Sequence, residues 1–306
     1  MFVRNQKKYD MLGAITGDTI GSVYEFNNTK EYNFTCFTSE SGYTDDSVMT
    51  MAVAFWLLKD KECSYQSLED SMVLFGHNCP CPMGGYGSGF YRWLFFPHDL
   101  WQFDDRYGES PYISKTGRHP YGSFGNGSAM RASSVGWFFN TIEETERVAA
   151  ISASITHNHP EGVKGAQATA GAIFLARSGK TKNEIREYIE NTYGYDLHKS
   201  WKYWHPIYDW EDSCQGTVPQ AIICFLDSEN YEDAIRKAVS LGGDSDTLAC
   251  ITGGIAEAFY GGVPVQMVER VIRPFPLIFK KILMAMSERT AYGRICPSIV
   301  FPKDTD

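Results

Sequence analysis

The sequence lacks an excess of positive charge. Lysine and arginine together number 28 against 37 aspartate and glutamate residues, so the net charge is −9 and the pI is near 5.3. Proteins that bind along a nucleic-acid backbone need a basic surface. We therefore expect no extended nucleic-acid binding, although local backbone N–H groups could still bind a small anion.

Long apolar runs are also missing. No stretch approaches the ~18 apolar residues of a membrane helix, and Asp18 interrupts the apolar stretch near the amino terminus, where a secretory signal would lie. The eight cysteines have irregular spacing, which we interpret as reduced thiols in a cytoplasmic protein without a membrane partner. These cysteines are Cys36, Cys63, Cys79, Cys81, Cys214, Cys224, Cys250 and Cys296.

Alternating strand patterns are scarce, and helical periodicity dominates instead. No linker divides the chain, so we expect a single all-α domain over residues 1–306. The polar and aromatic stretch at 96–124 is expected to be a long surface loop, and 194–213 shows little periodicity. Helices are predicted at 9–24, 46–58, 66–76, 86–95, 127–138, 143–155, 160–178, 181–191, 217–227, 231–240, 246–260 and 265–289.

The first predicted helix carries a stripe of glycine. Gly13, Gly17 and Gly21 recur every four residues, and Asp18 lies between them. Glycine costs about 1 kcal/mol relative to alanine inside a helix. The stripe therefore predicts close approach of another helix, or a nearby ligand.

Two short acidic stretches each precede an apolar, helix-like run. They are Thr44-Asp45-Asp46 and Asp244-Ser245-Asp246-Thr247. One reading is that these acids cap helices, where free N–H groups and the helix dipole favour them. The other is that both stretches face a shared pair of divalent cations, since Mg²⁺ prefers oxygen ligands and takes one or two carboxylates per ion. Two stretches of nearly mirrored composition favour the metal site.

Three further stretches contain residues suited to ligand binding. A glycine-rich loop at 121–128 precedes an apolar run and could bind phosphate, or could be an ordinary capped loop. Thr156-His157-Asn158-His159-Pro160 could serve a ligand, but a capped turn is the favoured reading. His77, Cys79 and Cys81 could suggest zinc, but they lack a fourth ligand at a suitable spacing.

These motifs occur in an order that resembles the ADP-ribosylglycohydrolase family, which includes the dinitrogenase reductase-activating glycohydrolase. The resemblance runs from about residue 10 to 262, and Ser47 stands where many members carry threonine. The order is Gly17-Asp18-Thr19-Ile20-Gly21 with Glu25, then Thr44-Asp45-Asp46-Ser47, then Gly125-Asn126-Gly127-Ser128-Ala129-Met130-Arg131, then Thr156-His157-Asn158-His159-Pro160, and then Gly242-Gly243-Asp244-Ser245-Asp246-Thr247.

The resemblance implies a compact, orthogonal bundle of helices around a cleft that holds two Mg²⁺ or Mn²⁺ ions. The residues that match the family's metal motifs are Thr44, Asp45, Asp46, Asp244, Asp246 and Thr247. Those that match its ADP-ribose-binding positions are Ser123, Phe124, Gly125, Asn126, Gly127 and His157. Those implied to take part in catalysis are Glu25, Asp45, Asp46 and Asp246.

The activity that the resemblance implies is metal-dependent hydrolysis at the anomeric ribose carbon of an ADP-ribosyl conjugate, with free ADP-ribose as product. The acceptor stays open between arginine, serine, another side chain, a nucleobase or a small molecule. The alternative is a protein that binds ADP-ribose without turnover, but a complete set of acids in both motifs favours an enzyme. We further hypothesise that Glu25 rides on a mobile lid formed by the polar loop that follows it.

Overall fold

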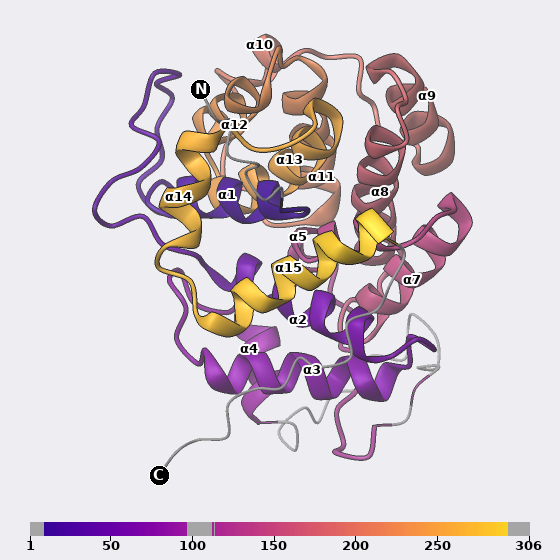
Figure 1. Cartoon of the computed structure of the whole chain (residues 1–306). Helices are drawn as coiled ribbons and strands as arrows, with labels where there is room; N and C mark the ends of the chain where they lie inside the picture. Colours follow the sequence, from indigo (N-terminus) through magenta and orange to yellow (C-terminus); the bar gives the residue numbers. More distant parts are fainter. Residues whose placement is uncertain (1–8, 97–111, 113, 293–306) are drawn as a thin grey trace.

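All regular structure in the described part of the chain is helical. The computed structural model describes residues 9–96, 112 and 114–292 (Figure 1). Within these residues the β-structure consists of two isolated bridges, Thr44 with Met83 and Gly125 with Ser213. The all-α prediction is therefore confirmed.

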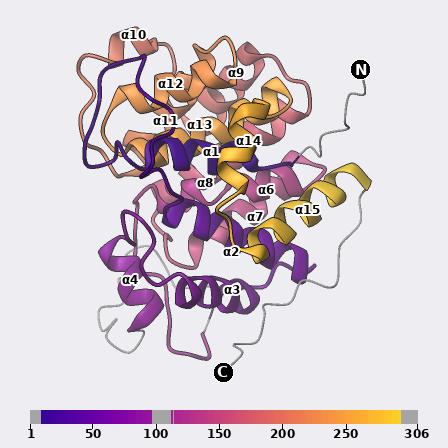
Figure 2. The same ribbon diagram turned by 60° about the vertical axis from the view of Figure 1, so that its left-hand side comes forward.

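Helices α1 (Leu12–Gly21) and α13 (Ser245–Tyr260) lie side by side at the centre of the molecule (Figures 1 and 2). A Cβ atom on Gly17 would overlap the carbonyl oxygen of Ala249, and one on Gly21 would overlap the backbone of Asp246. The predicted close approach along the glycine stripe is confirmed. Because the two helices run antiparallel, the end of α1 lies beside the start of α13.

A buried acid fixes the other end of this helix pair. The carboxylate of Glu257 on α13 accepts hydrogen bonds from the backbone N–H groups of Leu12 at 3.2 Å and Gly13 at 2.7 Å. These N–H groups belong to the first turn of α1, where they lack partners within the helix. Glu257 is fully buried, so this contact sets where α1 begins along α13.

The remaining helices surround this pair. In both views α3 and α4 lie below α2, whereas α9, α10 and α12 lie at the opposite end (Figures 1 and 2). The buried apolar side chains form one continuous cluster. The helices around the central pair are α2 (Asp45–Lys59), α3 (Tyr65–Asn78), α4 (Ser88–Phe95), α5 (Gly127–Met130), α6 (Ser133–Phe138), α7 (Ile142–Ser154), α8 (Pro160–Arg177), α9 (Lys182–Tyr193), α10 (Trp201–Trp204), α11 (Cys214–Leu226), α12 (Tyr231–Leu241), α14 (Val265–Ile272) and α15 (Leu277–Tyr292).

Three expectations differ from the structure. The helix predicted at 127–138 is divided at Arg131 into α5 and α6, in a stretch rich in glycine and serine, which are weaker helix formers than alanine. The helix predicted at 265–289 is broken by Pro274 and Pro276, since proline removes a hydrogen-bond donor and clashes with the preceding turn. The region 194–213 contains one helical turn, α10. Much of the expected loop at 96–124, namely 97–111 and 113, lies outside the described residues.

The cysteines are reduced wherever the structure describes them. All seven cysteines from Cys36 to Cys250 are free, as predicted, whereas Cys296 lies outside the described residues. His77 stacks on Phe95, and the groups of potential metal ligands among the described residues do not include it. In the same part of the chain, no helix combines the length and apolar character needed to cross a membrane.

Candidate active site

Asp18 on α1 fixes the start of α2. Its Oδ1 accepts a hydrogen bond from the hydroxyl of Thr44 at 2.8 Å, and its Oδ2 accepts from the backbone N–H groups of Thr44 and Ser47 at 3.1 Å each. The Ser47 hydroxyl also donates to Oδ2. Burial raises the pKa of Asp18 to about 6 despite these donors. Sequence reasoning assigned Asp18 no role; an acid inside a glycine-striped helix was the signal for one.

The two acidic stretches meet in space. The Thr247 hydroxyl at the start of α13 donates to Asp46 Oδ2 at 3.2 Å. Helix capping explains only part of this arrangement: the Thr44 hydroxyl caps α2 by accepting from the Asp46 N–H, whereas Asp244 makes no capping bond to α13. Asp244 instead accepts a hydrogen bond from Asn126 at 2.7 Å. The carboxylates therefore face one another for a reason other than capping.

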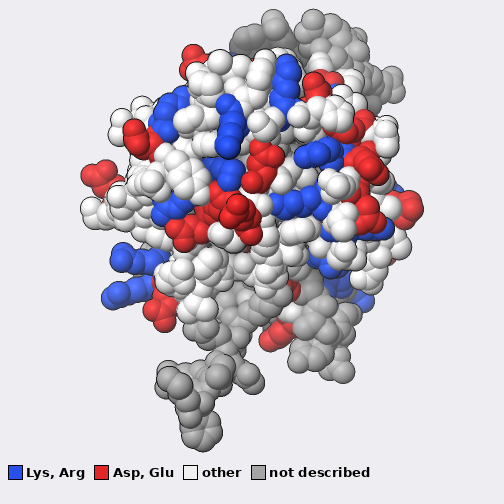
Figure 3. Space-filling model, turned by 90° about the horizontal axis from the view of Figure 1, so that it is seen from above, with Lys and Arg blue, Asp and Glu red and all other residues white. Residues whose placement is uncertain are grey.

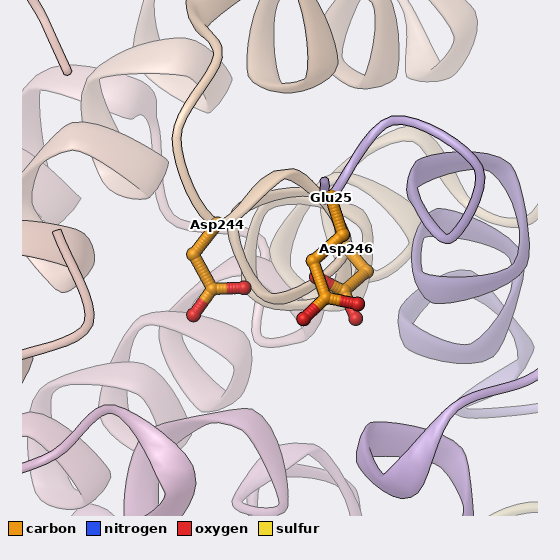
Figure 4. A group of neighbouring side chains, drawn as sticks. All are labelled: Glu25, Asp244 and Asp246. Atoms are coloured by element: carbon orange, nitrogen blue, oxygen red, sulfur yellow. The ribbon is translucent and has the colours of Figure 1, made fainter. Parts of the chain in front are cut away.

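Glu25 joins this cluster from the segment that follows α1. One carboxylate oxygen from each of Glu25, Asp244 and Asp246 lies within 4.8 Å of the other two, and the three groups point toward the same space (Figure 4). Asn28 holds Glu25 there, because its amide donates to the backbone oxygens of Glu25 at 2.7 Å and Gly243 at 2.9 Å. The Gly243 N–H donates back to Asn28 Oδ1 at 2.6 Å. Asn28 thus ties the start of the polar loop to the residues before α13, and the mobile lid stays a prediction.

The electrostatics of the cluster suit a cation. Burial and neighbouring carboxylates raise the pKa of Glu25 to about 7, and burial and Glu25 raise the pKa of Asp246 to about 8. Burial and neighbouring carboxylates also raise the pKa values of Asp45 and Asp46 well above the usual range. Glu25 Oε2, Asp46 Oδ1 and Asp246 Oδ1 are buried without a hydrogen-bond partner. Buried, unpaired carboxylate oxygens that repel one another are costly unless a metal binds them.

The glycine-rich loop lies against the cluster. Besides binding Asp244, the Asn126 amide donates to the Thr217 hydroxyl at 3.1 Å, so this side chain holds protein groups in place. Ser123 accepts from the Gly125 N–H at 3.2 Å. The helix that begins at Gly127 is the single turn α5, shorter than the predicted helix.

A chain of hydrogen bonds orients His157 toward this loop. The guanidinium of Arg131 donates to the Thr156 hydroxyl at 2.8 Å, and that hydroxyl lies 2.7 Å from His157 Nδ1. Because the Thr156 hydroxyl accepts from Arg131, its proton is free for Nδ1, which leaves the ring proton on Nε2. Burial and Arg131 lower the pKa of His157 well below the usual range. We therefore assign a neutral imidazole whose Nε2–H faces Gly125 and Gly127.

The other motif residues act as the capped-turn reading expected. His159 Nδ1 accepts from the Glu161 N–H at 3.0 Å and caps α8, and Asn158 accepts from the Gly122 N–H at 2.8 Å. Phe124 is half exposed and packs edge-on against His159. The turn therefore contacts the glycine-rich loop through Asn158 and His159.

One cavity of about 400 Å³ connects the carboxylates with the loop. Thr44 and Phe124 are not among its lining residues, since the Thr44 hydroxyl is bound to Asp18 and Phe124 packs on His159. A separate cavity of about 650 Å³ near α14 has a mainly apolar lining and none of the cluster's carboxylates. The expected site residues that line the first cavity are Glu25, Asp45, Asp46, Ser123, Gly125, Asn126, Gly127, His157, Asp244, Asp246 and Thr247.

Comparisons with known proteins place the chain in a family. The family model described as ADP-ribosylglycohydrolase matches residues 10–293. The chain belongs to the ADP-ribosylglycohydrolase family. This confirms the resemblance on which the sequence-based expectations rested.

Two of the relatives are named for hydrolysis of ADP-ribosyl groups. ADP-ribosylhydrolase ARH3 of Bos taurus is 25% identical in an alignment of 314 positions that covers 82% of this chain and 84% of that protein. ADP-ribosylarginine hydrolase Tri1 of Pseudomonas putida is 24% identical over 292 residues, which cover 87% and 74%. The solved structure titled ADP-ribosylglycohydrolase-related protein complex has a TM-score of 0.63 at 22% identity and covers 92% of this chain and 94% of its own, which shows the shared fold.

Proposed function

We propose that this protein is a divalent-metal-dependent hydrolase that releases ADP-ribose from a modified acceptor. The observation that carries the proposal is the set of buried carboxylate oxygens without partners, brought together from the segment after α1, from α2 and from α13 beside one cavity. Family membership and the names of the relatives support the same activity.

The residues proposed to hold two cations, Mg²⁺ or Mn²⁺, are those of the two facing stretches. Asp45, Asp46, Asp244 and Asp246 would supply carboxylate oxygens, and the Thr247 hydroxyl would add a neutral one. The Thr44 hydroxyl donates to Asp18 and accepts from the Asp46 N–H, so one lone pair would remain for a cation. When bound, such ions stabilise negative charge that develops on oxygen and lower the pKa of water.

The rest of the cavity is proposed to bind the ADP-ribosyl group. The glycine-rich loop would lie against the pyrophosphate, and the Nε2–H of His157 points at the same loop. Because the N–H groups of Gly122, Gly125 and Asn126 are bound within the protein, His157 is the donor that we propose for the pyrophosphate. Binding this remote, non-reacting part positions the ribose at the carboxylates. A neutral His157 suits a donor role, because its pKa keeps it from titrating at physiological pH.

The reaction we propose is hydrolysis. Water adds its hydroxyl group to the anomeric carbon, the bond from that carbon to the acceptor heteroatom breaks, and the acceptor leaves with the remaining proton. Positive charge develops on the sugar, which the surrounding carboxylates stabilise. Glu25 lines the same cavity and is not among the residues proposed to hold the cations, so it is suited to holding or moving the proton.

The proposal is tested by incubating the full chain with arginine-, serine- and nucleic-acid-linked ADP-ribose. Each conjugate is measured with Mg²⁺, with Mn²⁺ and with EDTA, and released ADP-ribose is quantified by chromatography. We expect metal-dependent release from at least one conjugate, and its loss with EDTA. Full turnover after exhaustive chelation would contradict the metal requirement. ADP-ribose binding without release from any conjugate would instead point to a binding protein.

A further inference from the structure

Two exposed aromatic side chains stand together at the rim of the cavity. Phe26 is 73% exposed and Trp210 is 47% exposed, and their rings stack with centroids 5.9 Å apart and an interplanar angle of 20°. Phe26 directly follows Glu25, whereas Trp210 comes from the segment before α11. Both line the same cavity as Glu25 and Asp246. A contiguous exposed apolar surface at a cavity rim is typical of a binding site.

The rim beside this pair is acidic. Asp212 lines the cavity, and its charge contributes to raising the pKa of Asp244. Its backbone is held in place, since its carbonyl oxygen accepts a hydrogen bond from the Asn126 N–H at 2.7 Å. Asp212 does not belong to the two acidic stretches proposed to bind cations, so its charge remains available at the rim.

The described residues that line the cavity offer no exposed positive charge to balance the negative charge of Asp212. Arg131 is the basic residue there, but it is 1% exposed and its guanidinium donates to Ser152 O and the Thr156 hydroxyl. The face of the molecule seen from above, by contrast, carries acidic and basic side chains interspersed (Figure 3). The cavity therefore presents an aromatic face and a carboxylate without a cation of its own.

We propose that Phe26, Trp210 and Asp212 form the acceptor subsite, and that it takes a guanidinium group. The substrate class is then ADP-ribose linked to arginine. A guanidinium stacks on aromatic faces and binds carboxylates through its planar donors. A serine acceptor is small and neutral, and it would gain nothing from this combination. The inference rests on the proposed function and names the acceptor for that same site.

The test compares two peptides of the same sequence that carry ADP-ribose on arginine or on serine. The full chain is assayed with Mg²⁺, together with Trp210→Ala, Phe26→Ala, Asp212→Asn and the conservative Trp210→Phe. Tyr203→Ala is the matched control, because Tyr203 is also 47% exposed but does not line the cavity. The affinity for free ADP-ribose is measured for every variant, and circular dichroism checks that each is folded.

We expect the unmodified chain to cleave the arginine conjugate with a kcat/KM at least about tenfold above that for serine. Trp210→Ala, Phe26→Ala and Asp212→Asn should each lower kcat/KM for the arginine conjugate by about fivefold or more. The serine conjugate and the ADP-ribose Kd should change less than about twofold, Trp210→Phe should keep most of the activity, and Tyr203→Ala should resemble the unmodified chain.

Three outcomes would overturn the inference. They are a preference for the serine conjugate, an equal loss on both conjugates, or a matching loss of ADP-ribose affinity, which would assign the aromatic pair to the nucleotide. Each leaves the proposed hydrolase function intact. Absence of release from both conjugates overturns the proposed function itself, and the acceptor assignment with it.

Discussion

At the scale of single residues, the carboxylates divide into those that build the site and those whose oxygens remain unpaired. Asp18 is fully engaged in fixing the first turn of α2. Asp46 and Asp246 each keep one buried oxygen without a partner. We therefore assign Asp18 a positioning role and propose Asp46 and Asp246 as metal ligands, although all three acids are buried.

Asp246→Asn and Asp45→Asn should each weaken Mg²⁺ binding. An amide supplies one neutral oxygen where a carboxylate supplies a charged one, and we expect Kd for Mg²⁺ to rise by about tenfold or more while the fold is kept. Titration calorimetry on metal-free protein measures this directly. Asp196→Asn is the control, since Asp196 is exposed and accepts a hydrogen bond from the His198 N–H. Unchanged activity of either variant at limiting Mg²⁺ would remove that residue from the proposed site.

Glu25→Gln should lower kcat by at least about tenfold, because a proton-transfer group contributes roughly 10²–10⁴-fold. The substitution is nearly isosteric, so Kd for ADP-ribose should stay within a few-fold. Steady-state kinetics and calorimetry on the same preparation decide between the two effects. An unchanged kcat would leave Glu25 without a role in the chemistry.

At the scale of elements, the contact between α1 and α13 sets the geometry of the site. Glu257 fixes one end of the contact, and Gly21 against Asp246 fixes the other. These two contacts therefore fix the position of the residues after α1 relative to the start of α13. Glu25 reaches Asp244 and Asp246 as a result.

Gly17→Ala should destabilise the protein by about 1–3 kcal/mol or more, because the added methyl group would overlap the Ala249 carbonyl. Gly171→Ala on α8 is the matched control. Its Cβ would make only ordinary contacts, the nearest at 3.5 Å, so it should be neutral or stabilising. Urea unfolding gives both free energies. Equal stability of the two variants would contradict the tight helix contact.

Gly125→Val should abolish stabilisation by ADP-ribose. A side chain at this position would lie 3.3 Å from Ser123 Oγ and 3.7 Å from His157 Nε2, where the ligand is proposed to bind. Free ADP-ribose should raise the thermal midpoint of the unmodified chain by mass action, and the variant should lose this rise. A retained ligand shift would place the pyrophosphate elsewhere.

At the scale of the whole molecule, the site couples stability to pH and to metal. The pKa values of Glu25 and Asp246 are raised by folding from ordinary values of 4.5 and 3.8 to about 7 and about 8. A carboxyl group with a raised pKa contributes stability below its unfolded pKa and loses it as the pH rises through its folded pKa. The metal-free protein should therefore lose stability between about pH 4 and pH 8.

A divalent cation should reverse this loss, because it binds the ionised carboxylates of the folded state alone. We expect the unfolding free energy with EDTA to fall across this pH range, and the gap between Mg²⁺ and EDTA to widen as the pH rises. Urea titrations at several pH values with each additive provide the measurement. Identical pH profiles with and without Mg²⁺ would contradict a metal at these carboxylates.

Local patterns in the chain determined the helices, the glycine stripe and the two acidic stretches, because each depends on spacing along a single segment. They also pointed to the correct family through the order of its motifs. The breaks at Arg131 and at Pro274–Pro276 were missed, although glycine, serine and proline in the sequence signal them.

Only the tertiary structure decided what each polar group binds. It turns the Thr44 hydroxyl toward Asp18, commits the Asn126 amide to Asp244, and stacks Phe26 on Trp210 across the rim. These partners come from segments far apart in the chain, and their contacts depend on how the helices and the loops between them pack. Spacing within one segment carries no information on such contacts, because burial and hydrogen bonding are set by the neighbours that folding brings together.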